Sequence, residues 1–168
     1  MENGKWKILI LFFITYLFAL NLPEYFSASF VQKIYSNDKV LIYKGKIYTD
    51  SKNVFWKYTY PNEKKIWITD KVYVYEPDLI QVTISDKPKL NLFEAIKKAK
   101  KIKQNEYVAK VNNKKIYFLF DKTLQKAWYT DDVGNKVEIV FYNQTDKKIP
   151  KSLFTPTYPD DVDFIYQK

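Results

Sequence analysis

Most of this chain alternates apolar and polar residues with a period of two, and this pattern constrains the fold more than any other feature. From Phe26 onward, the alternating stretches are rich in Val, Ile, Tyr and Phe, which is typical of β-strands that bury one face. Turn-forming residues, such as Ser36-Asn37-Asp38 and Asn112-Asn113, separate the stretches. Short strands joined mostly by tight turns predict an antiparallel sheet that curls.

The strand and helix boundaries can be placed along the chain. We expect strands at about 26–35, 39–49, 53–60, 64–69, 72–76, 79–85, 107–111, 115–120, 124–130 and 136–143, with a C-terminal piece at 152–155 and 162–166. One amphipathic helix is expected from Leu92 to Lys103, with Asn91 as its N-cap and Glu94 completing a capping box. Its apolar stripe must pack on the sheet.

The N-terminus has the pattern of a secretory signal peptide. Lys5 and Lys7 precede an apolar run, Ile8–Leu20, that is too short to cross about 30 Å of hydrocarbon comfortably as a helix. Ala19 is the only small residue near the end of the run, so we expect cleavage of residues 1–19 and a single domain over residues 20–168. An uncleaved anchor is the alternative. Export of a cysteine-free chain fits a bacterial periplasm.

The composition excludes most catalytic chemistry. The chain has no Cys and no His, and every one of its 28 basic residues is lysine. Thiol nucleophiles, Ser-His-Asp triads and the usual Cys/His metal sites are therefore excluded. The doublets Asp131-Asp132 and Asp160-Asp161 are the candidates for a glycosidase-type carboxylate pair, but both lie among turn-forming residues. We expect turn formers there, and a protein that is no enzyme and uses no metal or cofactor.

Several strands carry apolar side chains on both faces. Val54, Trp56 and Tyr58 point to one face of their strand, whereas Phe55 points to the other. Two interpretations remain open: the helix and loops pack both faces, or one face lines a pocket for an apolar ligand. One short helix covers little of a wide sheet, which favours the pocket. Acyl chains would suit it, because each buried methylene contributes about 0.8 kcal/mol.

Five stretches occur in an order and spacing that resemble a known family. They are Phe26–Gln32, Gly45–Tyr48, Val54–Pro61, Ile66–Val82 and Leu153–Asp163. Together they resemble the periplasmic outer-membrane lipoprotein carrier family, LolA, across nearly all of residues 26–165.

The resemblance implies a mainly β fold: an unclosed antiparallel half-barrel with a helical lid over its concave face. It also implies a periplasmic chaperone that holds the acyl chains of lipoproteins between sheet and lid. The implied partners are acylated lipoproteins, an inner-membrane ABC-type release complex and an outer-membrane acceptor, and we expect a monomer that binds no nucleic acid. The expected lipid-binding side chains are Phe30, Val54, Trp56, Tyr58, Ile66, Ile68, Leu92, Phe93 and Ile96.

Two departures from the family pattern bear on the lid. The family often has an Arg-Pro pair before the aromatic strand, and that Arg ties down the closed lid; here the positions read Asp50-Ser51. Other contacts must therefore hold the lid. The N-terminal helix is nearly missing, because only Leu20–Tyr25 precede the first strand. An alternative function stays open: the basic run Lys97–Lys103 could dock on anionic lipid or an acidic partner without any acyl cargo.

Overall fold

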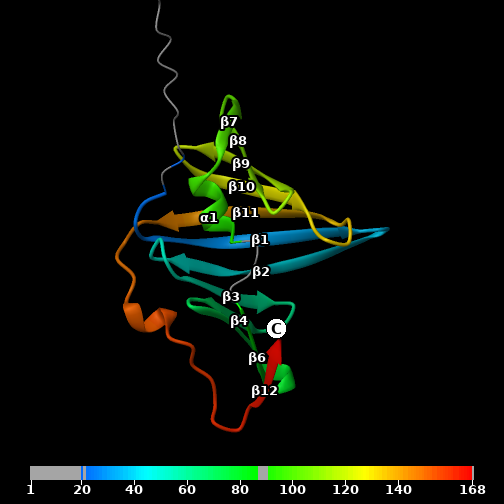
Figure 1. Cartoon of the computed structure of the whole chain (residues 1–168), viewed down its shortest axis with the longest axis vertical. Helices are drawn as coiled ribbons and strands as arrows, with labels where there is room; N and C mark the ends of the chain where they lie inside the picture. The colour runs from blue at the N-terminus through cyan, green and yellow to red at the C-terminus, as the bar shows by residue number, and fades with distance from the viewer. Residues whose placement is uncertain (1–19, 21, 87–90, 168) are drawn as a thin grey trace, which may run out of the picture.

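The computed structural model describes residues 20, 22–86 and 91–167, and most of these residues lie in one twelve-stranded sheet (Figure 1). The predicted signal peptide lies outside the described residues. The strands are β1 (Phe26–Ser36), β2 (Lys39–Thr49), β3 (Val54–Tyr60), β4 (Lys64–Ile68), β5 (Lys71–Glu76), β6 (Gln81–Asp86), β7 (Lys100–Lys103), β8 (Glu106–Val111), β9 (Lys114–Asp121), β10 (Thr123–Thr130), β11 (Lys136–Thr145) and β12 (Asp163–Gln167).

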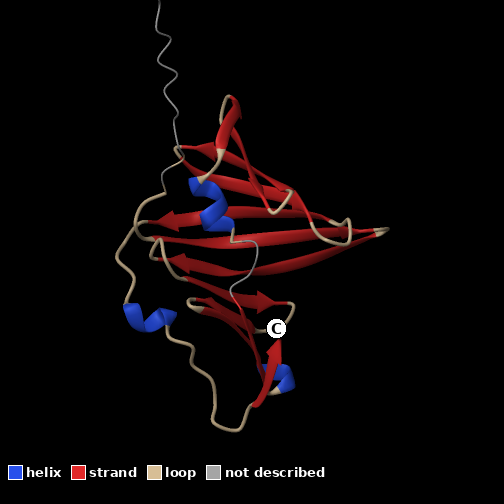
Figure 2. Ribbon diagram, in the orientation of Figure 1, coloured by secondary structure: helices blue, strands red, loops and turns tan. Residues whose placement is uncertain are grey.

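Helical structure is sparse in the part of the chain that the structure describes (Figure 2). It consists of one α-helix, α1 (Leu92–Lys97), and two 3₁₀ turns, η1 (Pro77–Leu79) and η2 (Lys151–Phe154). Among these described segments, none is a helix long and apolar enough to cross a membrane.

The strand order is β12-β6-β5-β4-β3-β2-β1-β11-β10-β9-β8-β7. Strands β1 to β6 form one meander, and β7 to β11 form a second meander that joins the first through the antiparallel pair β1–β11. The last strand, β12, returns to pair with β6 in parallel. The sheet curls without closing, so β12 and β7 are its edges. The predicted fold class, an unclosed half-barrel with a helix on its concave face, is confirmed.

The turn residues act as their chemistry predicts. Asn112 and Asn113 both have positive φ, 47° and 65°, as the tight turn between β8 and β9 requires. Gly45 lies on β2 beside β3, and a Cβ atom there would overlap the backbone carbonyl of Lys57. Both acidic doublets lie at turns, Asp131-Asp132 between β10 and β11 and Asp160-Asp161 before β12.

The helix prediction was wrong in its second half. The helix ends at Lys97, and residues Lys100–Lys103 form the edge strand β7, paired with β8. Continued helix would stack lysines at i,i+3 and i,i+4 spacing, which is destabilising. In the extended strand these charges lie farther apart, and the backbone forms antiparallel pairing with β8. The basic run is therefore split between a helix end and a lysine-rich edge, and does not form one cationic helix face.

Two further boundaries differ from expectation, one in the C-terminal segment and one at the start of β6. Residues 152–155 were expected as strand but lie mostly in η2, where Pro150 precedes the turn. The expected strand 79–85 begins at Gln81, because Pro77 starts the 3₁₀ turn η1 and Ile80 takes a left-handed conformation, φ 50°.

Apolar side chains pack on both faces of the sheet. The inner cluster lies on the concave face and joins α1 to the middle strands through residues such as Phe30, Trp56 and Phe93. The outer cluster lies on the convex face of β3–β6, where Ile149, Phe154 and Val162 of the C-terminal segment cover Phe55, Trp67, Tyr75 and Val82. The indole N–H of Trp67 donates to the carbonyl of Leu153 at 3.2 Å. The interpretation that the helix and loops pack both faces is thus confirmed for the convex face of β3–β6 and for the part of the concave face that α1 covers.

Candidate functional site

The concave face carries an apolar row that runs straight across the sheet. Successive strand registers place Ile47, Trp56, Ile66, Val74, Thr83 and Ile165 opposite one another, from β2 to β12. Ile47 is fully buried and Trp56 is 9% exposed, Ile66 and Val74 are half-buried, and Ile165 is 42% exposed. The protein's own described groups therefore cover one end of the row and leave the other end accessible.

A cleft opens beside the middle of this row, where Ile66 lies. It has a volume of about 460 Å³, within the range typical of small-ligand sites. Its apolar walls come from Ile34, Tyr43, Tyr58, Ile66 and Leu79, on β1, β2, β3, β4 and η1. Its polar lining consists of Gln32, Asn62, Glu63, Lys64, Glu76 and Asp78, of which Lys64 and Glu76 form a 2.7 Å ion pair. The cleft can thus hold an apolar chain with a polar end near this polar lining.

One polar pair lies within the cleft wall. The hydroxyl of Tyr58 donates to the side-chain carbonyl of Gln32 at 3.1 Å, and the Tyr58 ring packs edge-on against Phe30. Burial raises the pKa of Tyr58 above its ordinary value of 10.0, so the phenol stays neutral. The pair therefore adds hydrogen-bonding groups to the cleft without adding charge.

The structure brings all nine expected lipid-binding side chains to the concave face. Tyr58 and Ile66 line the cleft, and Phe93 and Ile96 line a smaller cavity of about 200 Å³ beside Leu20 and Leu22. The other five are buried in the inner cluster: Phe30, Val54, Trp56, Ile68 and Leu92. Their role in lipid binding stays a prediction.

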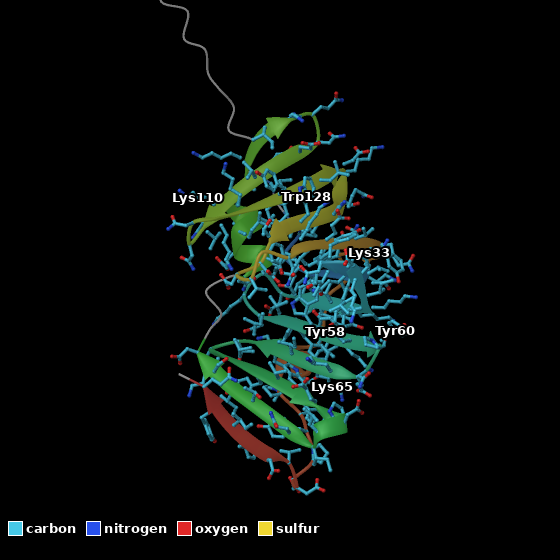
Figure 3. All side chains as sticks on the ribbon, turned by 90° about the vertical axis from the view of Figure 1, so that its right-hand side faces the viewer. Lys33, Tyr58, Tyr60, Lys65, Lys110 and Trp128 are labelled. Atoms are coloured by element: carbon cyan, nitrogen blue, oxygen red, sulfur yellow. The ribbon has the colours of Figure 1, made fainter. Side chains whose placement is uncertain are left out.

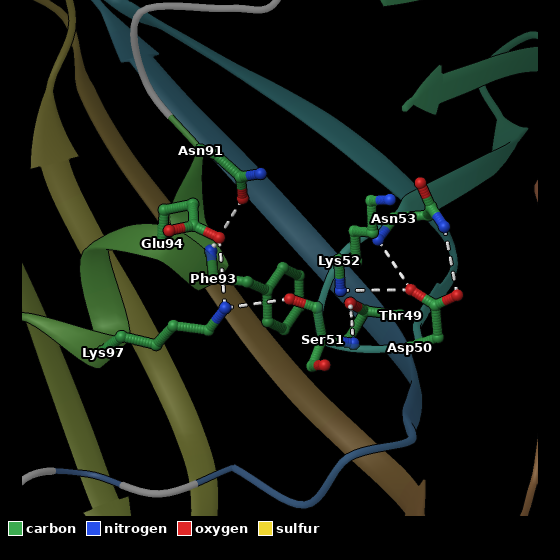
Figure 4. A network of polar contacts seen from close by, with 9 residues as sticks. All are labelled: Thr49, Asp50, Ser51, Lys52, Asn53, Asn91, Phe93, Glu94 and Lys97. Carbon is green, nitrogen blue, oxygen red and sulfur yellow. Dashed lines mark hydrogen bonds and ion pairs between the residues drawn. The ribbon is translucent and has the colours of Figure 1, made fainter. Parts of the chain in front are cut away.

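Helix α1 is held by a lysine rather than by an arginine (Figure 4). The ammonium group of Lys97 donates to the carbonyl of Ser51 at 2.9 Å and contacts the Glu94 carboxylate at 3.1 Å. Asn91 caps the helix, since its side chain accepts from the N–H of Phe93 at 3.0 Å. The contact between the lid helix and the Asp50-Ser51 turn is therefore made by a residue of the helix, Lys97.

Sequence reasoning missed several cleft residues. Gln32, Ile34 and Tyr43 line the cleft, but their strands read simply as alternating residues near a turn. The signal that could have found them is the register of β1 with β2, which places Gln32 opposite Tyr43. That register follows from the Ser36-Asn37-Asp38 turn, because the turn fixes which residues of the hairpin face each other.

Nothing in the described ranges resembles a metal centre, since no group of three or more acidic side chains there could hold an ion. The Asp131 carboxylate instead accepts hydrogen bonds from the backbone N–H groups of Val133 and Asn135. Desolvation opposes ionisation of this carboxyl, but the hydrogen bonds outweigh it and lower the pKa of Asp131. Asp131 therefore has the contacts of a turn-forming residue.

Two solved structures have a fold similar to that of this chain. A conserved protein from Thermus thermophilus aligns over 87% of this chain and 92% of its own, with a TM-score of 0.56 at 13% identity. A LolA superfamily protein from Nitrosomonas europaea aligns over 82% and 93%, with a TM-score of 0.50 at 10% identity. The chain thus has the fold of the LolA superfamily. No family model matches the sequence.

Sequence relatives then give the family. The outer-membrane lipoprotein carrier protein of Wolinella succinogenes is 34% identical over 149 residues, covering 84% of this chain and 87% of the relative. The protein of the same name from Helicobacter pylori J99 is 33% identical over 148 residues, covering 84% and 80%. The chain therefore belongs to the outer-membrane lipoprotein carrier protein family.

Proposed function

We propose that this protein is a periplasmic carrier that binds the acyl chains of lipoproteins on its concave face and delivers them toward the outer membrane. The proposal rests chiefly on the apolar row from Trp56 to Ile165, which runs from the inner cluster to the edge of the sheet and contributes Ile66 to the wall of the cleft. The names of the relatives at 33–34% identity support the choice of lipoproteins as cargo.

The physical basis of binding is burial of hydrocarbon. At about 0.8 kcal/mol for each methylene removed from water, partial burial of an acyl chain along Ile66, Val74 and Ile165 gives firm retention. The aromatic and aliphatic walls of the cleft favour an uncharged chain, and its charged side chains, which include Glu63 and Asp78, lie beside these walls. The charged groups Lys64 and Glu76 leave room for the polar end of a lipid.

Deeper binding requires α1 to move. Phe93 and Ile96 are 3% and 0% exposed and belong to the same buried cluster as Trp56 and Val54. Displacing the helix would expose these four side chains to cargo, whereas its return would favour release. The helix has only six residues, so its stability comes from this packing and from the Lys97 contact rather than from its own propensity.

The proposal includes the export of the protein and the partners between which it carries its cargo. Residues 1–19 act as a cleaved export signal, the mature chain works as a non-enzymatic monomer, and cargo passes from an inner-membrane ABC-type release complex to an outer-membrane acceptor. Release is driven by differences in affinity between successive binders, since the chain carries no nucleotide-binding loop.

Two variants with the same change in charge test the groove. Ile66→Asp puts a carboxylate into the cleft, whereas Thr59→Asp puts one on the exposed convex face of the neighbouring strand. We expect Ile66→Asp to weaken binding of an apolar dye and of a triacylated lipopeptide by tenfold or more, because a buried unpaired charge is costly (about 1 to 3 kcal/mol as a lower bound).

Thr59→Asp should bind both probes as the wild type does. Circular dichroism and thermal melting show whether each variant is folded. Equal affinity in folded Ile66→Asp and wild-type protein would contradict the assignment of the cleft.

A further inference from the structure

Most of the exposed aliphatic side chains among the described residues lie at one end of the sheet, whereas Ile102, Val140 and Ile165 lie elsewhere. Those at this end lie at or beside the turns β1–β2, β5–β6 and β10–β11 and are between 40% and 81% exposed. We call this set the aliphatic rim: Val40, Leu41, Ile42, Leu79, Ile80 and Val133. The turns that carry the rim lie on the right-hand side of Figure 1, the side that faces the viewer in Figure 3, where Tyr60 at the end of β3 is labelled.

The strand registers show that these turns share one end. Tyr35, beside the β1–β2 turn, pairs with Lys136 at the start of β11, which follows the β10–β11 turn. Lys64 at the start of β4 reaches Glu76 at the end of β5, which precedes η1. The turns Asp50–Asn53, Thr69-Asp70 and Asp121–Thr123, at the opposite end of the described strands, contain no exposed aliphatic side chain.

The β1–β2 hairpin forms the most prominent part of the rim. Strand β2 meets β3 only from Lys44 onward, so residues 39–43 extend beyond the neighbouring strand, and the hairpin projects from the sheet (Figure 1). Val40 and Ile42 point to one face of this ribbon and Leu41 to the other. A rigid partner surface covers one face of a ribbon, whereas a fluid lipid layer surrounds both.

The charge of the hairpin favours an anionic surface. Lys33, Lys39 and Lys44 form no ion pair within the described residues, and Asp38 is the only acidic residue of the hairpin. The whole chain has a net charge of +9. Acidic residues lie beside the other two turns of the rim, Asp78 before Leu79 and Asp131-Asp132 before Val133, so the cationic character belongs to the hairpin alone. Aliphatic side chains with lysines nearby, as on the hairpin, suit the boundary between lipid headgroups and acyl chains. The outer edge of β2 at residues 39–43 is not paired with β3. This edge limits how deeply the hairpin can insert into the lipid layer, because backbone groups without a hydrogen-bond partner are costly in hydrocarbon.

The cleft opens at this same end. Ile34 and Tyr43 of the hairpin and Leu79 of the rim are among its walls. We propose that the aliphatic rim docks on a bilayer containing anionic phospholipid and brings the mouth of the cleft to the membrane surface. An acyl chain can then pass between cleft and bilayer with little exposure to water. Only this last step rests on the proposed function; the docking itself does not.

A site-specific probe tests the docking. Because the natural chain has no cysteine, Leu41→Cys and Ile102→Cys each give one labelling site, and the two native side chains are 45% and 46% exposed. Ile102 lies on the edge strand β7, away from the rim. Each variant, exported under its own N-terminal segment, is labelled with a nitrobenzoxadiazole dye and mixed with vesicles of phosphatidylcholine containing about one third phosphatidylglycerol.

We expect the emission at position 41 to shift to the blue and rise severalfold with the mixed vesicles, less with phosphatidylcholine alone, and less at high salt. The emission at position 102 should not change. No response at position 41, an equal response at both positions, or a response independent of phosphatidylglycerol would each overturn the docking.

An unlabelled pair provides a second readout. Leu41→Ser combined with Ile42→Ser should lower partitioning into the mixed vesicles about tenfold, whereas Ile102→Ser should not. Unchanged partitioning of the double variant would also overturn the docking. Dye binding without vesicles, measured on the same proteins, reports on the cleft. Vesicle binding without dye binding would refute the proposed function alone, and dye binding without vesicle binding would refute the docking alone.

Discussion

At the scale of single residues, Gly45 shows how tightly the middle of the sheet is packed. Its Cα lies against the carbonyl of Lys57 on the neighbouring strand, and a side chain of any size would force the two strands apart. We expect Gly45→Ala to lower the free energy of unfolding by about 2 kcal/mol or more. Gly134→Ala, in an open turn at φ 90°, should cost about 1 kcal/mol, from backbone strain alone.

Urea unfolding of the two alanine variants measures both costs under the same conditions. An equal, small loss at both positions would mean that β2 and β3 can separate without cost at Gly45.

Glu138 gives the stability a defined dependence on pH. Lys136 and Lys126 donate to its carboxylate at 2.7 and 2.9 Å, and these bonds hold its pKa below the ordinary value of 4.5. A lowered carboxyl pKa stabilises the folded state above the unfolded pKa, and this contribution is lost as the pH falls through the folded pKa. The wild type should therefore exceed Glu138→Gln in stability by about 1 kcal/mol at pH 7.

Urea unfolding of both proteins between pH 7 and about pH 2 checks this. The stability difference should be constant down to about pH 4.5 and shrink below it. A difference that persists unchanged into strong acid would show that the carboxylate charge contributes nothing.

Residue chemistry predicted local features well. Positive φ values at Asn112 and Asn113 and the Asx contacts of Asp131 follow from the preferences of Asn and Asp in turns. The cleft residues Gln32, Ile34 and Tyr43 could not be predicted in the same way. Their position depends on which strands curl around them, and this is set by contacts far away in the sequence.

At the scale of elements, α1 depends on two polar contacts outside its packed face. Lys97→Ala removes the bond to the Ser51 carbonyl and the pair with Glu94. We expect faster hydrogen exchange in residues 92–97 and a global stability loss below about 1 kcal/mol, because these contacts are exposed. Lys98→Ala is the matched control, since the Lys98 side chain makes no ion pair or hydrogen bond within the described residues.

Hydrogen exchange followed by mass spectrometry compares the three proteins. If Lys97→Ala exchanges no faster than Lys98→Ala, the lysine does not hold the helix.

The elements also show where sequence patterns fail. The ten strands that were expected before residue 150 all exist, because period-two alternation is a strong local signal. The pattern at 92–103 fits a helix equally well throughout, but only its first half stays helical. Pairing with β8 decides the second half, and no local feature reveals that partner.

At the scale of the whole molecule, the sheet has two differently covered faces. The C-terminal segment covers the convex face over β3–β6, whereas α1 covers only part of the concave face. The sequence predicts the curled sheet and the helix on it, but not this division. The parallel return of β12 to β6 is a contact between distant segments, and it extends the apolar row to the sheet edge at Ile165.

The central claim is that acyl chains lie on the concave face, and tryptophan quenching tests it most directly. Trp56 lies in the inner cluster, whereas Trp67 and Trp128 lie toward the convex face. A lipopeptide with brominated acyl chains is added to the protein exported under its own N-terminal segment, whose proposed cleavage removes Trp6, and to the Trp56→Phe variant exported in the same way. We expect strong quenching in the first and little in the second, since bromine quenches only at contact. Equal quenching in both proteins, or none in the first, would contradict binding on the concave face.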